Sequence, residues 1–552
     1  MDSEQRKNFR PLWYALFITA GIVIGVSLNG SFNGSRNILF SRSTPSGFNK
    51  INDVINYIRQ EYVDTINQNQ IVDNTITQIL QNLDPHSSYI PADELKSVNE
   101  PLEGNFEGIG IEFHIQYDTI MVVSTIAGGP SETIGLRPGD RIVEVDGKNV
   151  AGIGIKNEDV FKYLRGQEGS KVAIKVKRNG LTKLLDFTII RGKIPIRSIE
   201  TSFMATSNTG YIKISRFAAN TYEEFMDALN ELKKQSAQNL IIDLRGNPGG
   251  YLDAATALAN EFLKGKKLIV YTQGKARPRK EYYSNGEGTF ENGKLFILID
   301  EGSASASEIL SGALQDWDRA EIIGRRSFGK GLVQEQTLFP DGSAMRLTVA
   351  RYYTPTGRSI QKPYKEGTLA YDDEVIERYK HGEMLNADST HFNDSLKYKT
   401  PGGKIVYGGG GIMPDVFVPI DTTSDNEFSR AVFAFGIVSK FCYDYVDRNR
   451  NLLGVYKTLD QFEKNFKTEP KVFSDFIAYA ISNKIRPDEK NIASSKSLIS
   501  NQLKANIARL LFGNDGYYRI TLQEDKAYKI AVELSEQTNA DKTVSARVET
   551  KK

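Results

Sequence analysis

The sequence predicts a multidomain α/β and β protein, in which a small β-rich domain precedes a larger α/β domain and helical regions lie before and after them. Its 552 residues exceed what one hydrophobic core normally supports. Residues 98–192 hold short β-branched runs separated by glycines, which predict the β-rich domain. From residue 193 onward strands and helices alternate, which indicates parallel strands joined by crossover helices.

Composition excludes several classes of function. Lys and Arg number 70 and Asp and Glu 68, so the net charge of +2 leaves no basic footprint for nucleic acid. Hydrophobic residues make up 40% and charged residues 25%, as in ordinary globular domains. The single cysteine, Cys442, excludes an intramolecular disulfide and a metal site built on a thiolate pair. We expect no metal and no cofactor.

An uncharged apolar segment lies near the start of the chain. It covers residues 11–28 and follows Arg6, Lys7 and Arg10. Its length is at the lower limit for a bilayer-spanning helix, and it lacks a clear small-x-small cleavage site. Residues 1–30 are therefore predicted to be an uncleaved transmembrane anchor, with a removed signal peptide as the alternative. The basic flank predicts that the rest lies outside the cytoplasm, in the periplasm or at the cell surface.

Residues 31–97 are predicted to form a linker and a helical region. The linker, residues 31–47, is rich in Ser, Asn and Gly. Apolar residues then recur at helical spacing, and LDPHS at residues 83–87 ends the helical unit. The recurring residues are Phe48, Ile51, Val54, Ile55 and Ile58, then Ile71, Ile76, Ile79 and Leu80.

The α/β domain is predicted to span residues 193–425. Residues 365–411 within it are polar, end in four glycines and are interpreted as an insertion or lid. Residues 426–552 have helical apolar spacing and predict a separate C-terminal helical domain. The predicted strands are GYIKISRF, NLIIDLRG, KLFILID, EIIGRRSFG and SAMRLTVARYYT, and the predicted helices are YEEFMDALNELKKQ, DAATALANEFL and SASEILSGALQDW.

A serine cluster, GSASASE at residues 302–308, lies between an apolar strand and an amphipathic helix. At such a junction a serine hydroxyl is close to free backbone N–H groups and to the positive end of the helix dipole, and both stabilise an oxyanion. Serine and glutamate at a helix start also form a capping box, which is the more common reason for such a cluster. The cluster alone therefore leaves both interpretations open.

A lysine between two glycines, Lys330, occurs in SFGKGLVQ at residues 327–334. If Lys330 is buried its pKa falls, and a neutral amine can take the proton of a serine hydroxyl. Gln334 lies four residues on, hence on the same side of a strand, where its amide could hold the amine. On its own the motif is more often a β-turn with a solvated lysine.

Taken together, the motifs resemble those of the C-terminal processing peptidases, also called tail-specific or carboxyl-terminal proteases, of peptidase family S41A. The resemblance implies that Ser305 is the nucleophile, that Lys330, 25 residues downstream, is its general base, and that Gln334 assists. It rests on LDPHSSYI, GYIKISRF, IDLRGNPGGYLDAA, GSASASEILSGALQD, SFGKGLVQ and GGGGIMPD, which occur in the family's order.

The same resemblance implies a crotonase-like serine peptidase core. The oxyanion donors would be the backbone N–H of Ala306 and that of Gly249 or Gly250. The implied activity is that of a serine endopeptidase that cuts protein chains near their C-terminal tails. Tails and the membrane are thus the expected partners, and homo-oligomerisation stays open.

The β-rich segment, residues 98–192, resembles a PDZ domain. Its GIGI loop, formed by Gly108, Ile109, Gly110 and Ile111, would bind the carboxylate of a chain end. Backbone N–H groups of such a loop capture a C-terminal carboxylate while the tail adds to the sheet as a strand. GLRPGDRIVEVDGKNV is the second PDZ-like signature.

The histidines favour a lysine base. His86 and His114 lie outside the predicted α/β core, and His381 and His391 lie in the polar insertion. A serine–lysine dyad is a variant of the same acyl-transfer logic. Two other classes of protein share some of these features. A PDZ scaffold with an inactive core would not need both dyad residues, and a crotonase-like acyl-CoA enzyme would carry neither anchor nor PDZ domain.

Overall fold

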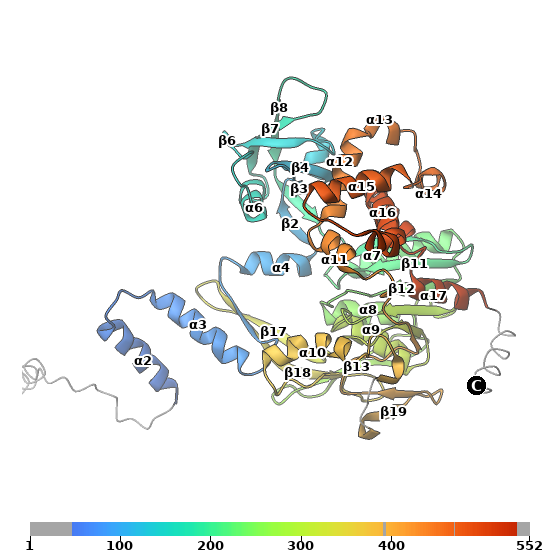
Figure 1. Cartoon of the computed structure of the whole chain (residues 1–552). Coiled ribbons are helices and arrows are strands. Elements are labelled where there is room, and N and C mark those ends of the chain that lie inside the picture. Colours follow the sequence, from blue (N-terminus) through green and yellow to red (C-terminus); the bar gives the residue numbers. More distant parts are fainter. Residues whose placement is uncertain (1–46, 390–393, 469, 538–552) are drawn as a thin grey trace, which may run out of the picture. The chain divides into compact units, whose positions relative to one another are not determined.

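The computed structural model describes residues 47–389, 394–468 and 470–537 (Figure 1). The predicted anchor, residues 1–30, lies outside this range. Within it, no helix is both long and apolar enough to cross a bilayer. The chain divides into two compact units, residues 1–76 and 77–552. The helices predicted from apolar spacing are confirmed as α2 (Gly47–Glu61) and α3 (Gln68–Gln81), the second of which continues into the larger unit.

The β-rich domain is confirmed. Its antiparallel sheet has the order β3-β4-β5-β7-β8, so β3 is an edge strand. Ile120, Val122, Ile142 and Val172 lie in its buried core, because alternate residues of each strand face inward. The elements are α4 (Leu95–Glu103), β2 (Asn105–Gly108), β3 (Ile111–Ile115), β4 (Ile120–Thr125), α5 (Pro130–Thr133), β5 (Arg141–Val145), β6 (Lys148–Asn149), α6 (Asn157–Leu164), β7 (Lys171–Lys177), β8 (Leu185–Ile190) and β9 (Gly192–Pro195).

A six-stranded sheet of order β10-β11-β12-β15-β16-β21 forms the centre of the α/β domain. The strands from β11 to β21 pair in parallel, as the alternation predicted, and β10 adds antiparallel at one edge. The bounds are β10 (Ile199–Met204), β11 (Thr209–Ile214), α7 (Thr221–Lys234), β12 (Asn239–Asp243), α8 (Leu252–Asn260), β15 (Leu295–Ile299), α9 (Ala306–Asp316), β16 (Glu321–Gly324) and β21 (Val416–Phe417).

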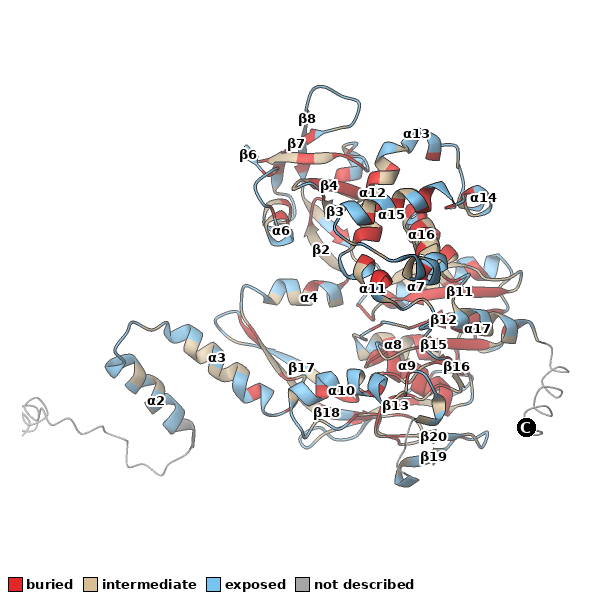
Figure 2. Ribbon diagram, viewed as in Figure 1, coloured by how far each residue is buried: buried red, intermediate tan, exposed pale blue. Residues whose placement is uncertain are grey.

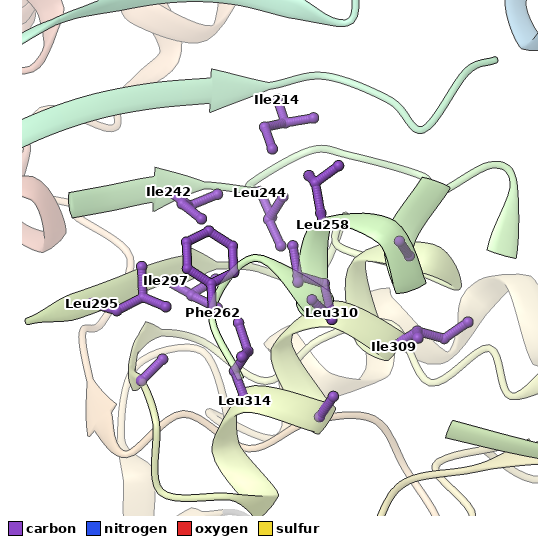
Figure 3. Close-up of a cluster of buried hydrophobic side chains, with 14 of the residues drawn as sticks. Ile214, Ile242, Leu244, Leu258, Phe262, Leu295, Ile297, Ile309, Leu310 and Leu314 are labelled. Carbon is purple, nitrogen blue, oxygen red and sulfur yellow. The ribbon is translucent and has the colours of Figure 1, made fainter. Parts of the chain in front are cut away.

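Helices α8 and α9 cover one face of this sheet. Ile242 and Ile297 of the strands meet Leu258 of α8 and Leu310 of α9 in a buried cluster (Figure 3). Strands buried on both faces read as continuous apolar runs, and β11, β12 and β15 are buried along their whole length (Figure 2). This packing fixes the start of α9 at the carboxyl end of β15.

The opposite face of the sheet is covered by the end of the C-terminal region. Tyr211 and Ile241, which alternate with the residues of the first cluster, pack with Leu522 and Ala531. Ala531 lies on α17 (Lys526–Glu536), and Leu522 follows α16 (Glu489–Thr521). The prediction of a separate C-terminal domain is therefore only partly right, because its last helix completes the core of the α/β domain.

The rest of the C-terminal region has its own core and contacts the β-rich domain. Arg141 of β5 pairs with Asp447 at 3.0 Å, and the His114 ring stacks on Tyr443 at a centroid distance of 4.8 Å. The region thus connects the β-rich domain to the sheet that α17 covers. Its further helices are α11 (Glu427–Ala434), α12 (Ile437–Arg448), α13 (Arg450–Leu453), α14 (Leu459–Asn465) and α15 (Lys471–Ser482).

A second sheet joins segments from across the chain. Strand β18 pairs with β1, β13 and β17, and β14 follows β13. Sequence analysis predicted β18 but not these partners. The bounds are β1 (Ser88–Ile90), β13 (Leu268–Gln273), β14 (Lys280–Tyr283), β17 (Leu332–Leu338) and β18 (Ala344–Tyr353), with α10 (Thr368–Lys380), the 3₁₀ turns Ala387–Ser389 and Asp394–Leu396, β19 (Lys397–Lys399) and β20 (Ile405–Tyr407) in the predicted insertion.

Candidate active site

The turn between β15 and α9 presents one serine of the cluster to a cavity. The Ser303 hydroxyl is buried and donates to the Leu244 carbonyl at 2.8 Å. The Ser307 hydroxyl is also buried and donates to the Asn247 carbonyl at 3.0 Å. Ser305, the N-cap of α9, lines the cavity instead. Its φ of 55° and ψ of −111° are rare for a non-glycine residue and turn it away from its neighbours.

The cavity has a volume of about 490 Å³ and is enclosed by segments far apart in the sequence. The predicted residues Ser305, Lys330 and Gln334 all line it, and so do Gly249 and Gly250. The structure therefore brings these candidates together at one place. The remaining lining residues are Val98, Asn99, Leu102 and Glu103 of α4, Pro248 and Tyr251 in the segment after β12, Gln336 of β17 and Arg346 of β18.

The Lys330 side chain lies in surroundings that favour its neutral form. Burial lowers its pKa below the ordinary value for lysine, because the charged ammonium loses its hydration. The Glu308 and Asp84 carboxylates oppose this shift, whereas the Arg346 guanidinium adds to it. The net direction is downward, as required of a lysine that accepts a proton.

Glu308 joins the nucleophile turn to the lysine loop. Its buried carboxylate accepts hydrogen bonds from the N–H groups of Ser305 at 2.8 Å, Lys330 at 2.9 Å and Gly329 at 2.7 Å. The Ser327 hydroxyl donates to it at 2.6 Å. Burial raises the pKa of Glu308 to about 7 even though these bonds act in the other direction. The sequence identified Glu308 only as half of a capping box and missed the contacts to the loop.

The serine and the lysine share a cavity, and among the described residues no hydrogen bond joins the Ser305 hydroxyl to the Lys330 amine. The Tyr352 hydroxyl lies 2.6 Å from the Lys330 carbonyl oxygen and 3.1 Å from that of Ser305, and so joins the two backbones. Catalytic hydrogen bonds are often long without substrate and shorten in its complex.

Two glycines line the cavity at positions where a side chain would not fit. A Cβ on Gly249 would lie 2.7 Å from the Ser305 Cβ, and one on Gly250 would overlap the Phe217 carbonyl oxygen. The Gly249 N–H donates to the Asn247 Oδ1 at 2.8 Å. The Gly250 N–H has no acceptor among the described residues. Of the pair that the sequence left open, Gly250 thus has the available donor.

Gln334 belongs to a chain of polar contacts that runs through Thr348 to Asp84. It lies on β17, which begins at Leu332, so Lys330 precedes the strand rather than sharing it. The Gln334 Nε2 donates to the Thr348 Oγ1 at 3.3 Å, and the Thr348 hydroxyl donates to the Asp84 Oδ1 at 3.0 Å. Gln334 thus holds the opposite strand, and its role toward the amine stays a prediction.

His86 lies nearer the candidate base than the sequence suggested. Strand β1 attaches its segment to β18, and burial together with the charge of Lys330 lowers the pKa of His86 to about 4. Its Nε2 lies 2.9 Å from the Tyr371 hydroxyl. His86 precedes β1 and lies outside the parallel sheet, as expected, but local periodicity does not reveal the long-range pairing of β1 that brings its charge within reach of Lys330.

Part of the predicted insertion braces the lysine loop. Arg378 of α10 is buried and donates from Nη1 to the Ser327 carbonyl at 3.0 Å and from Nη2 to the Arg326 carbonyl at 2.6 Å. Its Nε donates to Glu383 at 2.9 Å. Within the segment interpreted as an insertion or lid, residues 365–411, α10 is thus part of the support of the site.

The predicted carboxylate-binding loop lies beside a groove in the β-rich domain. Ile109, Gly110 and Ile111 line this groove, whereas Gly108 lies at the end of β2 and does not. The groove runs between edge strand β3 and helix α6. An edge strand has unpaired backbone groups to which an extended peptide can add. The other residues that line the groove are Phe106, Phe113, Val160, Phe161, Leu164 and Arg165.

Three protein families match parts of the chain. Residues 208–369 match peptidase family S41, and residues 121–178 match the PDZ domain. Residues 428–513 match a family of unknown function. The matches thus fall within the α/β domain, the β-rich domain and the C-terminal region.

Individual relatives carry related names. The carboxy-terminal processing protease CtpA of Bacillus subtilis is 33% identical over 384 residues, which is 69% of this chain and 80% of the relative. The carboxy-terminal-processing protease of Bartonella bacilliformis is 32% identical over 426 residues, 75% of this chain and 94% of the relative. A solved structure of a photosystem II D1 C-terminal processing protease is 27% identical, with a TM-score of 0.36, and covers 69% of this chain and 88% of that one.

Proposed function

Because the chain belongs to the C-terminal processing peptidases of family S41, which are serine peptidases, and carries a PDZ domain, we propose that it cuts protein substrates with a Ser305–Lys330 dyad after its PDZ domain has bound their C-terminal tails. The observation that carries the proposal is the shared cavity. Ser305 is the serine of its cluster that lines this cavity, and it does so together with a half-buried lysine whose pKa is lowered.

The dyad acts by acyl transfer. Neutral Lys330 takes the proton of the Ser305 hydroxyl as Oγ attacks the carbonyl carbon of the scissile bond. The N–H groups of Ala306 and Gly250 donate to the oxyanion that forms, and the start of α9 adds its dipole. Lys330 then gives its proton to the leaving amine, so that an acyl-enzyme remains. A water deprotonated by Lys330 releases the second product and restores Ser305.

Supporting residues hold this geometry. Glu308 binds the backbones of Ser305 and Lys330, and Gln334 and Thr348 belong to the network behind the amine. The available N–H of Gly250 favours it over Gly249 as the second oxyanion donor. We assign these groups a positioning role, apart from the oxyanion donors, which would contact the substrate.

Tail recognition is proposed for the groove beside β3. Ile109, Gly110 and Ile111 line this groove, so a tail that adds to the β3 edge would place its carboxylate against the backbone of this loop. For residues 1–30 we keep the proposal of a membrane anchor with the catalytic part outside the cytoplasm. It rests on the uncharged run and its basic flank, and membrane fractionation of the whole chain tests it.

Peptide cleavage tests the dyad and the groove separately. Ser305→Ala should abolish cleavage of a peptide with a free C-terminus, whereas Ser303→Ala, which removes a buried hydroxyl outside the cavity, should keep activity. Binding of the same peptide to Ser305→Ala, followed by fluorescence anisotropy, should weaken strongly when its C-terminus is amidated. Cleavage by Ser305→Ala would refute the dyad, and equal binding of the free and amidated peptides would refute tail recognition.

A further inference from the structure

Arg346 places a second cation beside the dyad. It lies on β18 and lines the cavity that holds Ser305 and Lys330. Its Nε donates to the Gln336 Oε1 at 3.0 Å, and its Nη2 donates to the Asn99 Oδ1 at 2.9 Å. Both acceptors are neutral amides, so they orient the guanidinium without cancelling its charge.

The charge of Arg346 contrasts with that of several other arginines in the same domain, which carboxylates neutralise. Arg346 forms no ion pair with any residue that the structure describes, and the groups that shift its pKa do not include a carboxylate. Burial, the largest influence, lowers this pKa. Examples of the neutralised kind are Arg245 with Asp243, Arg325 with Glu301, Arg326 with Glu383 and Arg358 with Asp316.

The guanidinium of Arg346 also has donors to spare. A guanidinium has more N–H groups than the bonds to Gln336 and Asn99 use, and Nη1 has no acceptor among the described residues. Glu103 lines the same cavity, but it is exposed and not bonded to Arg346. A half-buried cation with free donors fits a carboxylate, which it can bind through two parallel hydrogen bonds.

The strand register places Arg346 close to the reacting bond. Arg346 lies opposite Gln336 in the β17–β18 ladder, and Thr348 lies opposite Gln334, one side-chain step nearer Lys330. Side chains on one face of a strand are roughly 7 Å apart, and an extended substrate advances about 3.3 Å per residue. A group bound at Arg346 therefore belongs to a residue a short distance along the peptide from the bond that is cut.

We propose that Arg346 binds a carboxylate of the substrate within about three residues of the scissile bond, so that the enzyme prefers peptides with an acidic group there. This inference rests on the proposed function, since it requires cleavage by Ser305 in this cavity. The carboxylate is either an Asp or Glu side chain or the C-terminal carboxylate of a short substrate. Both sources offer the same planar anion to the guanidinium.

Two arms of one peptide series test the inference and separate the sources. In the first arm all peptides share a long tail with a free C-terminus, and Glu or Gln occupies one position at a time on either side of the scissile bond. In the second arm short peptides without acidic side chains end close after the bond, with either a free or an amidated C-terminus. Values of kcat/KM are compared on the plateau of the pH profile.

We expect wild type to prefer the acidic member of at least one pair by about 10-fold, as for a hydrogen bond to a charged group. Arg346→Gln should bring this ratio close to one, and Arg346→Lys should keep part of it because a charge remains. The control is Arg351→Gln on the same strand, an exposed arginine that donates to the Tyr364 hydroxyl at 2.9 Å and does not line the cavity. It should keep the wild-type ratio.

Each outcome decides a separate question. A preference in the first arm assigns the site to acidic side chains, and a preference in the second arm alone assigns it to a terminal carboxylate. No preference in either arm, or an unchanged ratio in Arg346→Gln, overturns the inference while leaving the proposed function intact. Cleavage of the same peptides by Ser305→Ala would instead overturn the proposed function.

Discussion

The Oε2 atom of Glu308 accepts a hydrogen bond from the backbone N–H of Lys330 at 2.9 Å, and the same atom accepts the N–H of Ser305 at 2.8 Å. One buried carboxylate thus sets the distance between the turn of the nucleophile and the loop of the base. Because its other oxygen binds Gly329 and Ser327, the loop is held from Ser327 to Lys330.

Glu308→Gln should lower kcat by about 10-fold or more with a smaller effect on KM. The carboxamide turns an N–H₂ group toward backbone N–H donors, and leaving a buried donor without a partner costs about 1–3 kcal/mol. Steady-state kinetics measures the effect. The matched control is Glu335→Gln, which removes an exposed ion pair with Arg277 and should change little. Wild-type kcat in Glu308→Gln would show that the hydrogen bonds of the Glu308 carboxylate do not position the dyad.

The same carboxylate predicts a pH-dependent stability. Burial raises the pKa of Glu308 from 4.5 to about 7, so the folded state binds this proton more tightly than the unfolded state. Its contribution is fully present below about pH 4.5 and is lost as pH rises to about 7. Over that window wild type should lose ~3 kcal/mol relative to Glu308→Gln.

Unfolding in urea at several pH values measures this difference. Removing residues 1–30 also removes Trp13, so that Trp317 at the end of α9 becomes the single tryptophan. Its fluorescence then reports on the surroundings of the site. A stability difference between wild type and Glu308→Gln that does not change with pH would contradict the prediction.

The sequence predicted those parts of the fold and site that depend on neighbouring residues. The apolar runs of β12 and β15 predicted a buried parallel sheet, and the resemblance to the C-terminal processing peptidases implied the pair Ser305 and Lys330, which the structure brings to one cavity. A strand that is buried on both faces has a continuous apolar run, so the local sequence is enough to predict it.

What the sequence did not reveal depends on pairing between distant segments. In the sequence Arg346 is one charged residue within a predicted strand. Its place in the cavity follows from the register of β18 with β17. The pairing of β1 with β18 places His86 near Lys330. Ala531 looked like any small helical residue, yet it packs on the sheet beside Tyr211. None of these contacts has a signal at helical or strand spacing.

Arg378→Ala tests whether α10 braces the lysine loop. Its guanidinium donates to the carbonyl groups of Ser327 and Arg326, so its loss leaves both acceptors unpaired and loosens the segment before Lys330. We expect kcat to fall by roughly 10-fold, with KM nearly unchanged, and partial rescue in Arg378→Lys, because an ammonium lacks the planar fork.

The control for this variant is Lys380→Ala, on the same helix, whose exposed pair with Glu377 should be dispensable. A lid over the site would affect KM, whereas a support of the lysine loop would affect kcat. If Arg378→Ala raises KM and leaves kcat unchanged, the helix governs substrate entry, and its bonds to the loop are incidental.

The charged groups that face Lys330 predict how activity depends on pH. These groups are Glu308 of α9, Arg346 of β18, and Asp84 and His86 before β1. Well above pH 7 Glu308 is ionised and His86, with a pKa of about 4, is neutral. Hydrogen bonds from Ser87, His86 and Thr348 keep the Asp84 carboxyl ionised against the effect of burial. The proton of Lys330 is then the one whose loss activates the enzyme.

Activity should therefore rise with pH along a single-proton limb that follows the lowered pKa of Lys330. Removing the positive charge in Arg346→Gln raises that pKa, so the limb should move to higher pH while the plateau for a neutral peptide is kept. Lys330→Arg should be inactive, since a guanidinium stays charged. Profiles of kcat/KM with a neutral peptide measure the shift. A limb that stays in place in Arg346→Gln, or near-wild-type turnover by Lys330→Arg, would mean that another group takes the proton from Ser305.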